Sequence, residues 1–374
     1  MEPTRIAQLR ASLDARGIGG AVLRHPANVR YITGLPATPW PVFALFSPTA
    51  SAVVAPGDSS AIRTHVGEQC HVFGYQVPGP TIDLVADVHA ISAAALAEAL
   101  ASLGLAGLRI GVEEAQISAL HAAVVGRFGK PVPIDGEVEA LRRIKDASEL
   151  ALIQSAVRLN DAGFAAAKEV IAQGVSELDV QNAVVSAMQN AAGVPIDVLD
   201  DTNCFISGPN ADHSVGLATP RRLERSDLMI VDINPFIHGY KGDTTRTFSV
   251  GPAEAGQQKI HDTLVRALLA AEAVARPGTR ACDVYKALAG TISDAGYGAG
   301  LRAHGGHAIG LEHLERPYII PGDEMVLEVG MVLSLEPGVY GPQFGGLRLE
   351  DNYVVTAKGL ELLSHYPRQL VQCD

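Results

Sequence analysis

The sequence predicts a mixed α/β (α+β) protein that is built from two domains. A chain of 374 residues is longer than one hydrophobic core usually organises, so we expect two. Segments with helical periodicity and short strand-like apolar runs occur along the whole chain, which indicates both kinds of element. A stretch at residues 131–136, with Pro131, Pro133 and Gly136, breaks the helical pattern and is the expected linker. The predicted domains are residues 1–136 and 137–374.

The expected elements follow from periodicity and from terminating residues. Helical spacing of apolar residues predicts helices at residues 4–16, 90–103, 147–172, 177–192, 257–275 and 280–295. The last helix stops before Gly296, a residue type that often ends helices. Short strand-like runs predict strands at residues 20–24, 42–46, 51–55, 109–112, 203–207, 228–233, 245–250, 331–336 and 347–355.

Four acids and one histidine lie within apolar or glycine-rich segments of the second domain. They are Asp232, Asp243, His307, Glu336 and Glu350. A carboxylate in apolar surroundings costs several kcal/mol unless a cation or a proton compensates it. A pair of divalent metal ions is the simplest compensation. A set of oxygen ligands with one imidazole suits manganese, cobalt, zinc or iron(II) better than magnesium or calcium.

The spacing of these residues predicts two hairpins that deliver them to one point. Asp232 and Asp243 flank a short connection between two strand-like runs, and Glu336 and Glu350 repeat this arrangement further along the chain. The ends of paired strands lie side by side, so each hairpin offers two acids. Alternation along a strand places Arg348 on the same face as Glu350.

Composition excludes some classes of partner. The formal net charge of −12 argues against nucleic acid and anionic membranes, which favour basic surfaces. The beginning of the sequence has no basic segment followed by an apolar stretch, and no apolar run is long enough to span a bilayer. The four cysteines lack CxxC spacing, which fits a reducing compartment. We therefore expect a cytoplasmic protein.

Four segments resemble the signature blocks of the pita-bread metallopeptidases (family M24), in the prolidase and Xaa-Pro aminopeptidase branch. They read VDINPFIHGYKGDTTRTF, GGHAIGLEHLERP, MVLSLEPGVY and GGLRLEDNYVVT. The segment RIAQLRASLDARGIGGAVL, followed by Asn28, Tyr31 and Gly34, resembles the creatinase-like N-terminal domain of this group. The resemblance implies a C-terminal pita-bread fold and a smaller N-terminal α/β domain with a mixed sheet.

The resemblance also implies a metal-ligand set. At the matching positions, Asp232 would chelate the first ion, Asp243 and Glu350 would bridge, and His307 and Glu336 would bind the second ion. The expected cofactors are two divalent ions, with manganese as the first expectation and cobalt, zinc or iron as alternatives. Glu336 would also act as general base and then as general acid.

Three further residues are predicted to have catalytic roles. The family has an active-site histidine after an SGPN-like turn, and His213 is the candidate here, although its distance from Asp232 is longer than the family pattern. Arg348 would orient the metal-binding carboxylates. Where the family usually has a histidine seven residues after the metal-binding one, this chain has Leu314. His313 is the neighbouring candidate, but adjacent residues of an extended chain point in opposite directions, so it would need a local bulge or twist.

The resulting functional prediction is dinuclear-metal hydrolysis of Xaa-Pro peptide bonds, by an Xaa-Pro aminopeptidase or an Xaa-Pro dipeptidase. The expected partner is a peptide with proline at the second position. Relatives are commonly homodimers, and the resemblance leaves two readings of the loop around Trp40: it borders the partner's site, or it is a local lip. One alternative is a metal-dependent small-molecule hydrolase or lyase of the same fold, suggested by Leu314 and the position of His213. The other is a non-catalytic binding scaffold.

Overall fold

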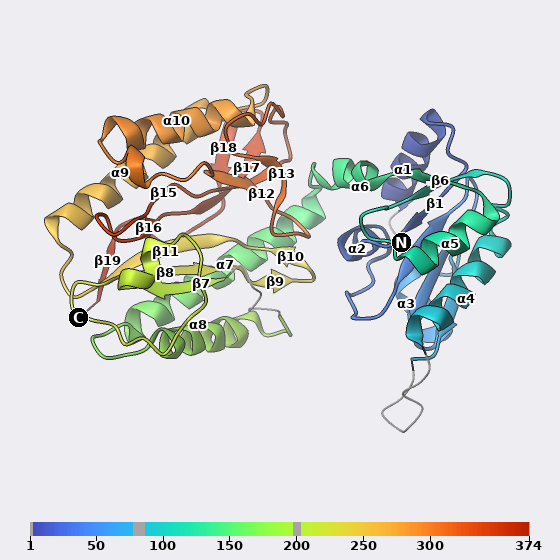
Figure 1. Ribbon diagram of the computed structural model, residues 1–374, viewed down its shortest axis with the longest axis horizontal. Helices are drawn as coiled ribbons and strands as arrows, with labels where there is room; N and C mark the ends of the chain where they lie inside the picture. Colours follow the sequence, from blue (N-terminus) through green and yellow to red (C-terminus); the bar gives the residue numbers. More distant parts are fainter. Residues whose placement is uncertain (1–2, 78–86, 197–202, 374) are drawn as a thin grey trace. The chain divides into compact units, whose positions relative to one another are not determined.

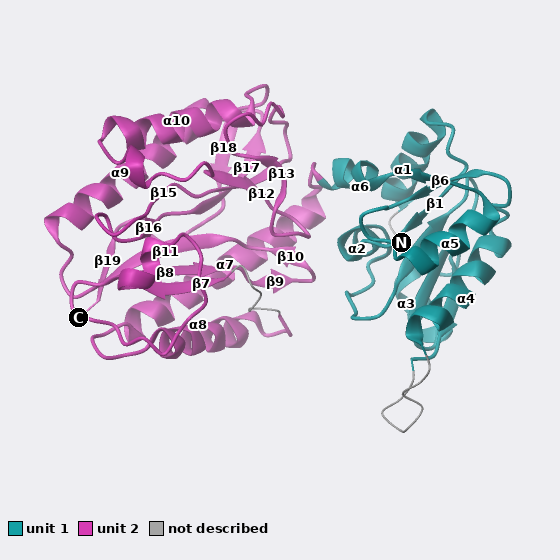
Figure 2. Cartoon of the chain, in the orientation of Figure 1, with its two compact units in different colours: residues 1–142 teal, residues 143–374 magenta. Residues whose placement is uncertain are grey.

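The computed structural model describes residues 3–77, 87–196 and 203–373. The chain forms two compact units, Met1–Arg142 and Arg143–Asp374 (Figure 2). Each unit has a sheet-centred core of its own.

The first unit contains a mixed six-stranded sheet with the order β4-β3-β2-β1-β5-β6. Strand β1 pairs antiparallel with β2 and parallel with β5, while β3–β4 and β5–β6 are also parallel. The strands are β1 (Gly20–Leu23), β2 (Phe43–Phe46), β3 (Ser51–Pro56), β4 (His71–Tyr75), β5 (Arg109–Val112) and β6 (Lys130–Pro133).

Six helices accompany this sheet in the described part of the first unit. They are α1 (Pro3–Ala15), α2 (Pro26–Thr33), α3 (Ser59–Val66), α4 (Val88–Ser102), α5 (Ala119–Phe128) and α6 (Asp135–Arg142). Side chains cap the beginnings of several of these helices. Asp58 accepts a hydrogen bond from the backbone N–H of Ser60 at the start of α3, and Ser118 accepts one from the backbone N–H of His121 at the start of α5. The apolar faces of α4 and α5 pack with β1–β3 and β5 in one core.

The linker expected at residues 131–136 is not a linker. Pro131 and Pro133 lie in β6, at the edge of the sheet, and Gly136 lies in α6. An edge strand tolerates proline because the missing N–H need not join a central ladder. Helix α6 packs against α1 and α2, so the boundary between the units falls after Arg142 rather than at residue 136.

The second unit places two sheets between two pairs of helices (Figure 1). One sheet has four strands in the order β19-β11-β8-β7, and the other has five in the order β13-β12-β14-β17-β18. Two small two-stranded sheets pair β9 with β10 and β15 with β16. The strands are β7 (Cys204–Ser207), β8 (Leu228–Ile233), β9 (Phe236–Ile237), β10 (Tyr240–Lys241), β11 (Thr244–Val250), β12 (Gly306–Ala308), β13 (Glu315–Tyr318), β14 (Val332–Leu335), β15 (Gly338–Val339), β16 (Leu347–Arg348), β17 (Asp351–Thr356), β18 (Gly359–Leu362) and β19 (Val371–Cys373).

Each of the two larger sheets of the second unit is covered by one helix pair. Helices α7 (Ala147–Val170) and α8 (Glu177–Ala192) pack on the four-stranded sheet, and α9 (Ala255–Val274) and α10 (Ala281–Asp294) pack on the five-stranded one. Short 3₁₀ helices occur at Gly208–Asp212 and Gly298–Gly300. Both α7 and α8 start with a capping box, formed in α7 by Asp146 and Glu149. Each helix pair thus covers one face of its sheet, and the ends of the strands that lie between the two sheets are not covered by these helices.

All six helices expected from periodicity are present, with small shifts at their ends, but the pattern missed four of the helices that the described residues form. These are α2, α3, α5 and α6, which have eight to ten residues each. Helices this short carry only about two turns of apolar spacing, so the periodicity is weak. None of the described helices is both long enough and apolar enough to cross a bilayer.

Candidate metal centre and its pocket

The first predicted hairpin is present and positions two acids. Strand β8 pairs antiparallel with β11, with Asp232 opposite Thr245. Asp243 lies just before β11, and the small β9–β10 hairpin forms the connection. Both carboxylates are buried at the inner end of this sheet.

The second sheet brings the other three residues to the same place. His307 lies in β12 opposite Ser334 of β14, Glu336 follows β14, and Glu350 lies directly before β17. Strands β14 and β17 pair antiparallel, so the two glutamates leave adjacent strand ends. The second predicted hairpin is therefore also present.

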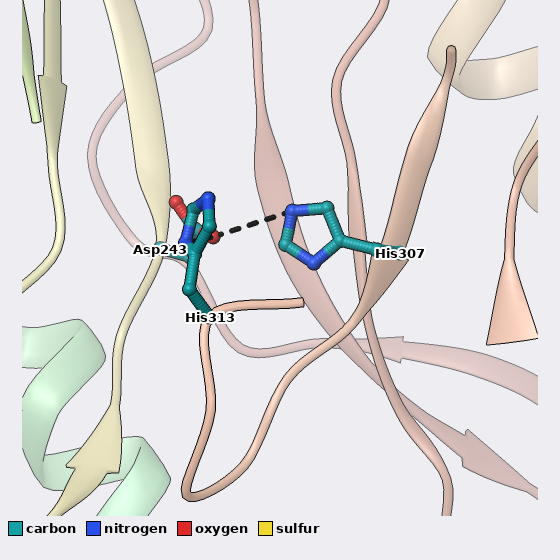
Figure 3. Close-up of side chains that lie close together, drawn as sticks. All are labelled: Asp243, His307 and His313. Carbon is teal, nitrogen blue, oxygen red and sulfur yellow. Dashed lines mark ion pairs between the residues drawn. The ribbon is translucent and has the colours of Figure 1, made fainter. Parts of the chain in front are cut away.

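The five residues converge on one cluster. His307 Nε2 lies 3.5 Å from Asp243 Oδ2 and 3.5 Å from Glu336 Oε1. Oxygen atoms of Asp232, Asp243 and Glu350 lie within 4.8 Å of one another, which is close enough to share a metal ion. Figure 3 shows the imidazole of His307 pointing at Asp243.

The orientation of His307 fits a metal ligand. Its Nδ1 lies 3.0 Å from the carbonyl oxygen of Ala308, to which it donates a hydrogen bond, so its Nε2 keeps a lone pair directed at two carboxylates. A lone pair facing carboxylate oxygens is repulsive unless a cation lies between them. Asp232 Oδ1 is also buried, with no hydrogen-bond partner in the described part of the chain. These donors match the preference of divalent ions for carboxylate oxygen and imidazole nitrogen.

The pKa values report the same excess of negative charge. Burial raises the pKa of Asp232 to about 7, and burial reinforced by the charge of Asp243 raises the pKa of Glu350 well above its ordinary value. Burial lowers the pKa of His307, which favours the neutral, metal-binding imidazole. Burial alone would raise the pKa of Glu336, but a hydrogen bond and positive charge from His304 bring it down to about 2.

Hydroxyl and guanidinium groups hold the carboxylates in place. Glu350 accepts hydrogen bonds from Thr245 Oγ1 at 2.6 Å and Ser334 Oγ at 2.5 Å. Arg348 Nη2 donates to Asp232 Oδ2 at 2.6 Å, and its Nη1 donates to the carbonyl oxygen of Ser214 at 2.7 Å. Arg348 thus contacts Asp232 of the cluster and also holds a pocket loop through Ser214.

The cluster opens into a pocket of about 420 Å³. The pocket is lined by four of the five predicted ligands, all except His307, together with Arg348. Its other lining residues are Ser214, Val215, Arg302, His304, His313, Leu314 and Tyr340.

His213 does not line this pocket. Its side chain is exposed, whereas the next two residues, Ser214 and Val215, are pocket-lining. The longer spacing between the SGPN turn and Asp232 therefore brings Val215 to the wall that a histidine was expected to occupy. This placement leaves His213 without a contact that supports a catalytic role.

His313, by contrast, reaches the cluster. Its Nδ1 lies 3.2 Å from Asp243 Oδ2, and its ring centroid lies 5.0 Å from that of His307 (Figure 3). The pairing of β12 with β13 has a register shift at His307 and Ala308, and the loop that follows carries His313 inward. The residues that this shift leaves unpaired, Arg316 and Pro317, follow His313, so the bends at residues 310–314 rather than the shift turn His313 inward. Leu314 lines the same pocket.

Sequence reasoning missed His304, which belongs to the site. Its Nε2 donates a hydrogen bond to Glu336 Oε1 at 2.8 Å, and its ring stacks near His307 at a centroid distance of 5.8 Å. The available signal was the HGGH spacing, in which two glycines let both imidazoles approach the same strand end. Tyr340, whose hydroxyl lies 3.3 Å from Arg348 Nη1, was missed as well.

Comparisons with known proteins match both units. The model of metallopeptidase family M24 matches residues 151–357, and that of the creatinase/prolidase N-terminal domain matches residues 5–144. An Xaa-Pro dipeptidase of Pyrococcus furiosus is 34% identical over 238 residues, which cover 64% of this chain and 68% of the relative. The uncharacterized peptidase YqhT of Bacillus subtilis is 28% identical over 380 residues, covering 98% of this chain and 99% of the relative.

A solved structure is similar along its whole length. The Xaa-Pro dipeptidase from Bacillus anthracis superposes with a TM-score of 0.87 at 25% identity, and the match covers 99% of each chain.

Proposed function

Because this chain belongs to metallopeptidase family M24, with a pita-bread catalytic domain and a creatinase-like N-terminal domain, we propose that it hydrolyses Xaa-Pro peptide bonds with two divalent metal ions. The observation that carries this proposal is the convergence of three buried carboxylates, the partly buried carboxylate of Glu336 and one imidazole at a single pocket. The named Xaa-Pro dipeptidases among the similar proteins support the substrate class.

The proposed ligands are the five residues predicted from the sequence. Asp232, Asp243 and Glu350 form one oxygen-rich group, and His307 with Glu336 forms the adjoining group. When bound, divalent ions supply Lewis acidity toward a peptide carbonyl and lower the pKa of water. Manganese is the proposed metal, with cobalt, zinc or iron as alternatives.

Proton transfer is assigned to Glu336. Its hydrogen bond from His304 keeps the carboxylate ionised at neutral pH, so it can accept a proton from water and pass it to the departing amine. His304 holds the orientation of this carboxylate through the same bond. Arg348 fixes Asp232 by donating to Oδ2. His313, at the pocket wall beside Asp243, is the proposed hydrogen-bond donor to the reacting group.

One observation favours a second candidate, a metal-dependent small-molecule hydrolase or lyase. Leu314 and Val215 form pocket wall at the two positions where histidines were expected from the family pattern. A changed wall alters the substrates that fit. The scaffold alternative is not favoured, because all five candidate ligands are present and gathered.

The test compares substrates and metals. The purified protein is assayed with Xaa-Pro dipeptides, Xaa-Pro-Yaa tripeptides and matched non-prolyl peptides, with manganese or cobalt added. We expect hydrolysis of prolyl substrates only. If the protein binds metal at stoichiometric level but hydrolyses none of these peptides, the peptidase proposal is rejected and the small-molecule hydrolase or lyase becomes the favoured function. If the protein takes up no metal, the non-catalytic scaffold becomes the favoured function.

We also propose a cytoplasmic homodimer. Cys70, Cys204, Cys282 and Cys373 are all buried, and none of them forms a disulfide within the described part of the chain, which fits a reducing compartment. Light scattering on the eluting protein measures the oligomeric state, and a monomeric mass would reject the dimer.

A further inference from the structure

We infer that Arg302 binds a free carboxylate of the substrate and so makes the site selective for dipeptides over longer peptides. This inference rests on the proposed function. It names a specificity residue outside the five candidate metal ligands and outside the proposed proton-transfer groups.

Arg302 belongs to the wall of the catalytic pocket. It follows the short helix Gly298–Gly300 and lines the same pocket as Glu336 and Tyr340. Its guanidinium carbon lies 5.7 Å from the centroid of the Tyr340 ring. Packing over an aromatic face holds the long side chain near the pocket while the charged group stays accessible.

The other cationic side chains of the pocket already face an acid. Arg348 is buried and donates to Asp232, and His304 donates to Glu336. His313 lies beside Asp243. Arg302 differs, since it makes no ion pair with any residue in the described ranges 3–77, 87–196 and 203–373.

The charge of the loaded pocket suits an anion. Two divalent cations would neutralise the four lining carboxylates, and Arg348 and Arg302 would leave a positive excess. Arginine offers a planar set of donors that matches the two oxygens of a carboxylate. A substrate carboxylate is therefore the partner that the pocket lacks.

The position of that charge distinguishes short from long substrates. In an Xaa-Pro dipeptide the carboxylate belongs to the proline itself, next to the scissile bond, whereas a longer peptide has an uncharged amide there. The rest of the pocket mouth includes the apolar side chains of Val215 and Leu314, which are 71% and 49% exposed. These two side chains carry no charge that could bind a C-terminal carboxylate, so Arg302 is the pocket residue that distinguishes a free carboxylate from an amide.

The experiment uses two substrates that differ by one charge, an Xaa-Pro dipeptide and the same Xaa-Pro amide. For the wild-type protein we expect a higher kcat/KM for the acid than for the amide. Arg302→Gln should reduce this preference roughly tenfold. The loss should appear as a raised KM for the acid, with kcat and amide hydrolysis nearly unchanged.

Two further variants make the result specific. Arg302→Lys keeps the charge and should keep part of the preference. Arg276→Gln removes an exposed arginine that lies outside the pocket, and it should leave both substrates unaffected.

Failure of this inference differs from failure of the proposed function. If the ratio of kcat/KM for the acid to kcat/KM for the amide is unchanged in Arg302→Gln, the proposed role of Arg302 is wrong, although the protein still hydrolyses peptides. An equal loss of kcat/KM on both substrates leaves the ratio unchanged and would likewise reject this role. If the wild-type protein hydrolyses neither substrate, the proposed function fails. In that case, the affinities of L-proline and of L-prolinamide are measured for the wild-type protein and for Arg302→Gln. A substitution that weakens the binding of both ligands equally would reject the contact between Arg302 and the carboxylate.

Discussion

At the scale of single residues, the dominant physical fact is that one cluster holds three buried carboxylates and the partly buried carboxylate of Glu336. Burial raises the pKa of Asp232 and Glu350, which shows that their ionised forms are unfavourable with protein groups alone. Hydroxyl donors and Arg348 compensate part of the charge. Bound divalent cations would complete the compensation and would couple folding of this site to metal binding.

The substitutions Asp243→Asn and Glu350→Gln test the two central acids. Each keeps the shape of the side chain but removes a negative charge, so we expect loss of bound metal and at least about a 100-fold loss of kcat/KM. Metal analysis of the purified variants and peptide assays measure both effects. Asp262→Asn, at an exposed position of α9, is the matched control and should behave as wild type. Retained metal and activity in either site variant would reject the ligand assignment.

His304→Ala tests the histidine that orients Glu336. Loss of the 2.8 Å hydrogen bond should lower kcat by roughly 10–100-fold with little effect on KM, because the bond positions a proton-transfer group rather than the substrate. His304→Gln can still donate a hydrogen bond and should recover part of the rate. A change confined to KM would assign His304 to substrate binding instead.

At the scale of elements, the loop that follows β7 is closed by one buried carboxylate. Glu177, the first residue of α8, accepts hydrogen bonds from five groups: the backbone N–H and hydroxyl of Ser207, the amide of Asn210, and the backbone N–H and hydroxyl of Thr219. Ser207 and Thr219 are the two ends of the loop whose middle residues line the pocket. A helix start thereby sets the position of a pocket wall.

Glu177→Ala should release this loop. Several buried donors would lose their acceptor, so we expect a decrease of about 3 kcal/mol in the free energy of unfolding and roughly a tenfold lower kcat/KM. Glu169→Ala, at an exposed position near the end of α7, should change neither quantity. Urea denaturation and peptide assays give the two values. Wild-type kinetics in a destabilised Glu177→Ala protein would confine the residue to a purely structural role.

A second element-scale feature predicts the response of the first unit to acid. His121 of α5 is buried, with Nε2 at 3.0 Å from the hydroxyl of Ser92 in α4 and Nδ1 at 2.6 Å from that of Ser118. Burial lowers the pKa of His121 to about 4. The unfolded chain therefore binds a proton more readily than the folded chain does, and stability falls as the pH drops from about 6.5 to 4.

His121→Asn should weaken this acid response. In the wild-type protein we expect a loss on the order of 2–3 kcal/mol between pH 7 and pH 4 from this histidine. The variant will start less stable at pH 7, since it disturbs a buried contact, but its stability should depend less on pH. Urea denaturation at both pH values measures the difference, and an identical pH dependence in the two proteins would contradict the prediction.

At the scale of the whole molecule, the candidate metal centre belongs to only one of the two units. All five candidate ligands lie in the second unit, Arg143–Asp374, and the one tryptophan of the sequence, Trp40, lies in the first. Fluorescence of Trp40 therefore reports the first unit, while circular dichroism reports both.

Chelation of the metal ions should affect the units differently. We expect a loss of about 3 kcal/mol or more from the second unit, since a ligand at 100 times its dissociation constant stabilises by that amount. The thermal transition seen by circular dichroism should move to lower temperature, while the Trp40 transition should not. Equal shifts of both signals would show that the units unfold as one.

Whether a helix could be predicted from the sequence depended on its length. Long helices such as α7 and α9 carry enough apolar repeats to be found, but short ones such as α3 do not. Pro131 and Pro133 suggested a linker because their local preference is to interrupt structure. They form an edge strand since β5 offers a partner from elsewhere in the chain, and no local pattern contains that partner.

The sequence by itself determined the nature of the site. An acid within an apolar strand-like run needs a compensating charge wherever the chain folds, so Asp232, Asp243, His307, Glu336 and Glu350 could be identified together. Only the tertiary structure decided which other groups face them. Bends in the loop between β12 and β13 bring His313 to the pocket, while a longer loop leaves His213 outside and puts Val215 on the wall. Side chains on loops are placed by contacts between distant segments, and local sequence does not specify those contacts.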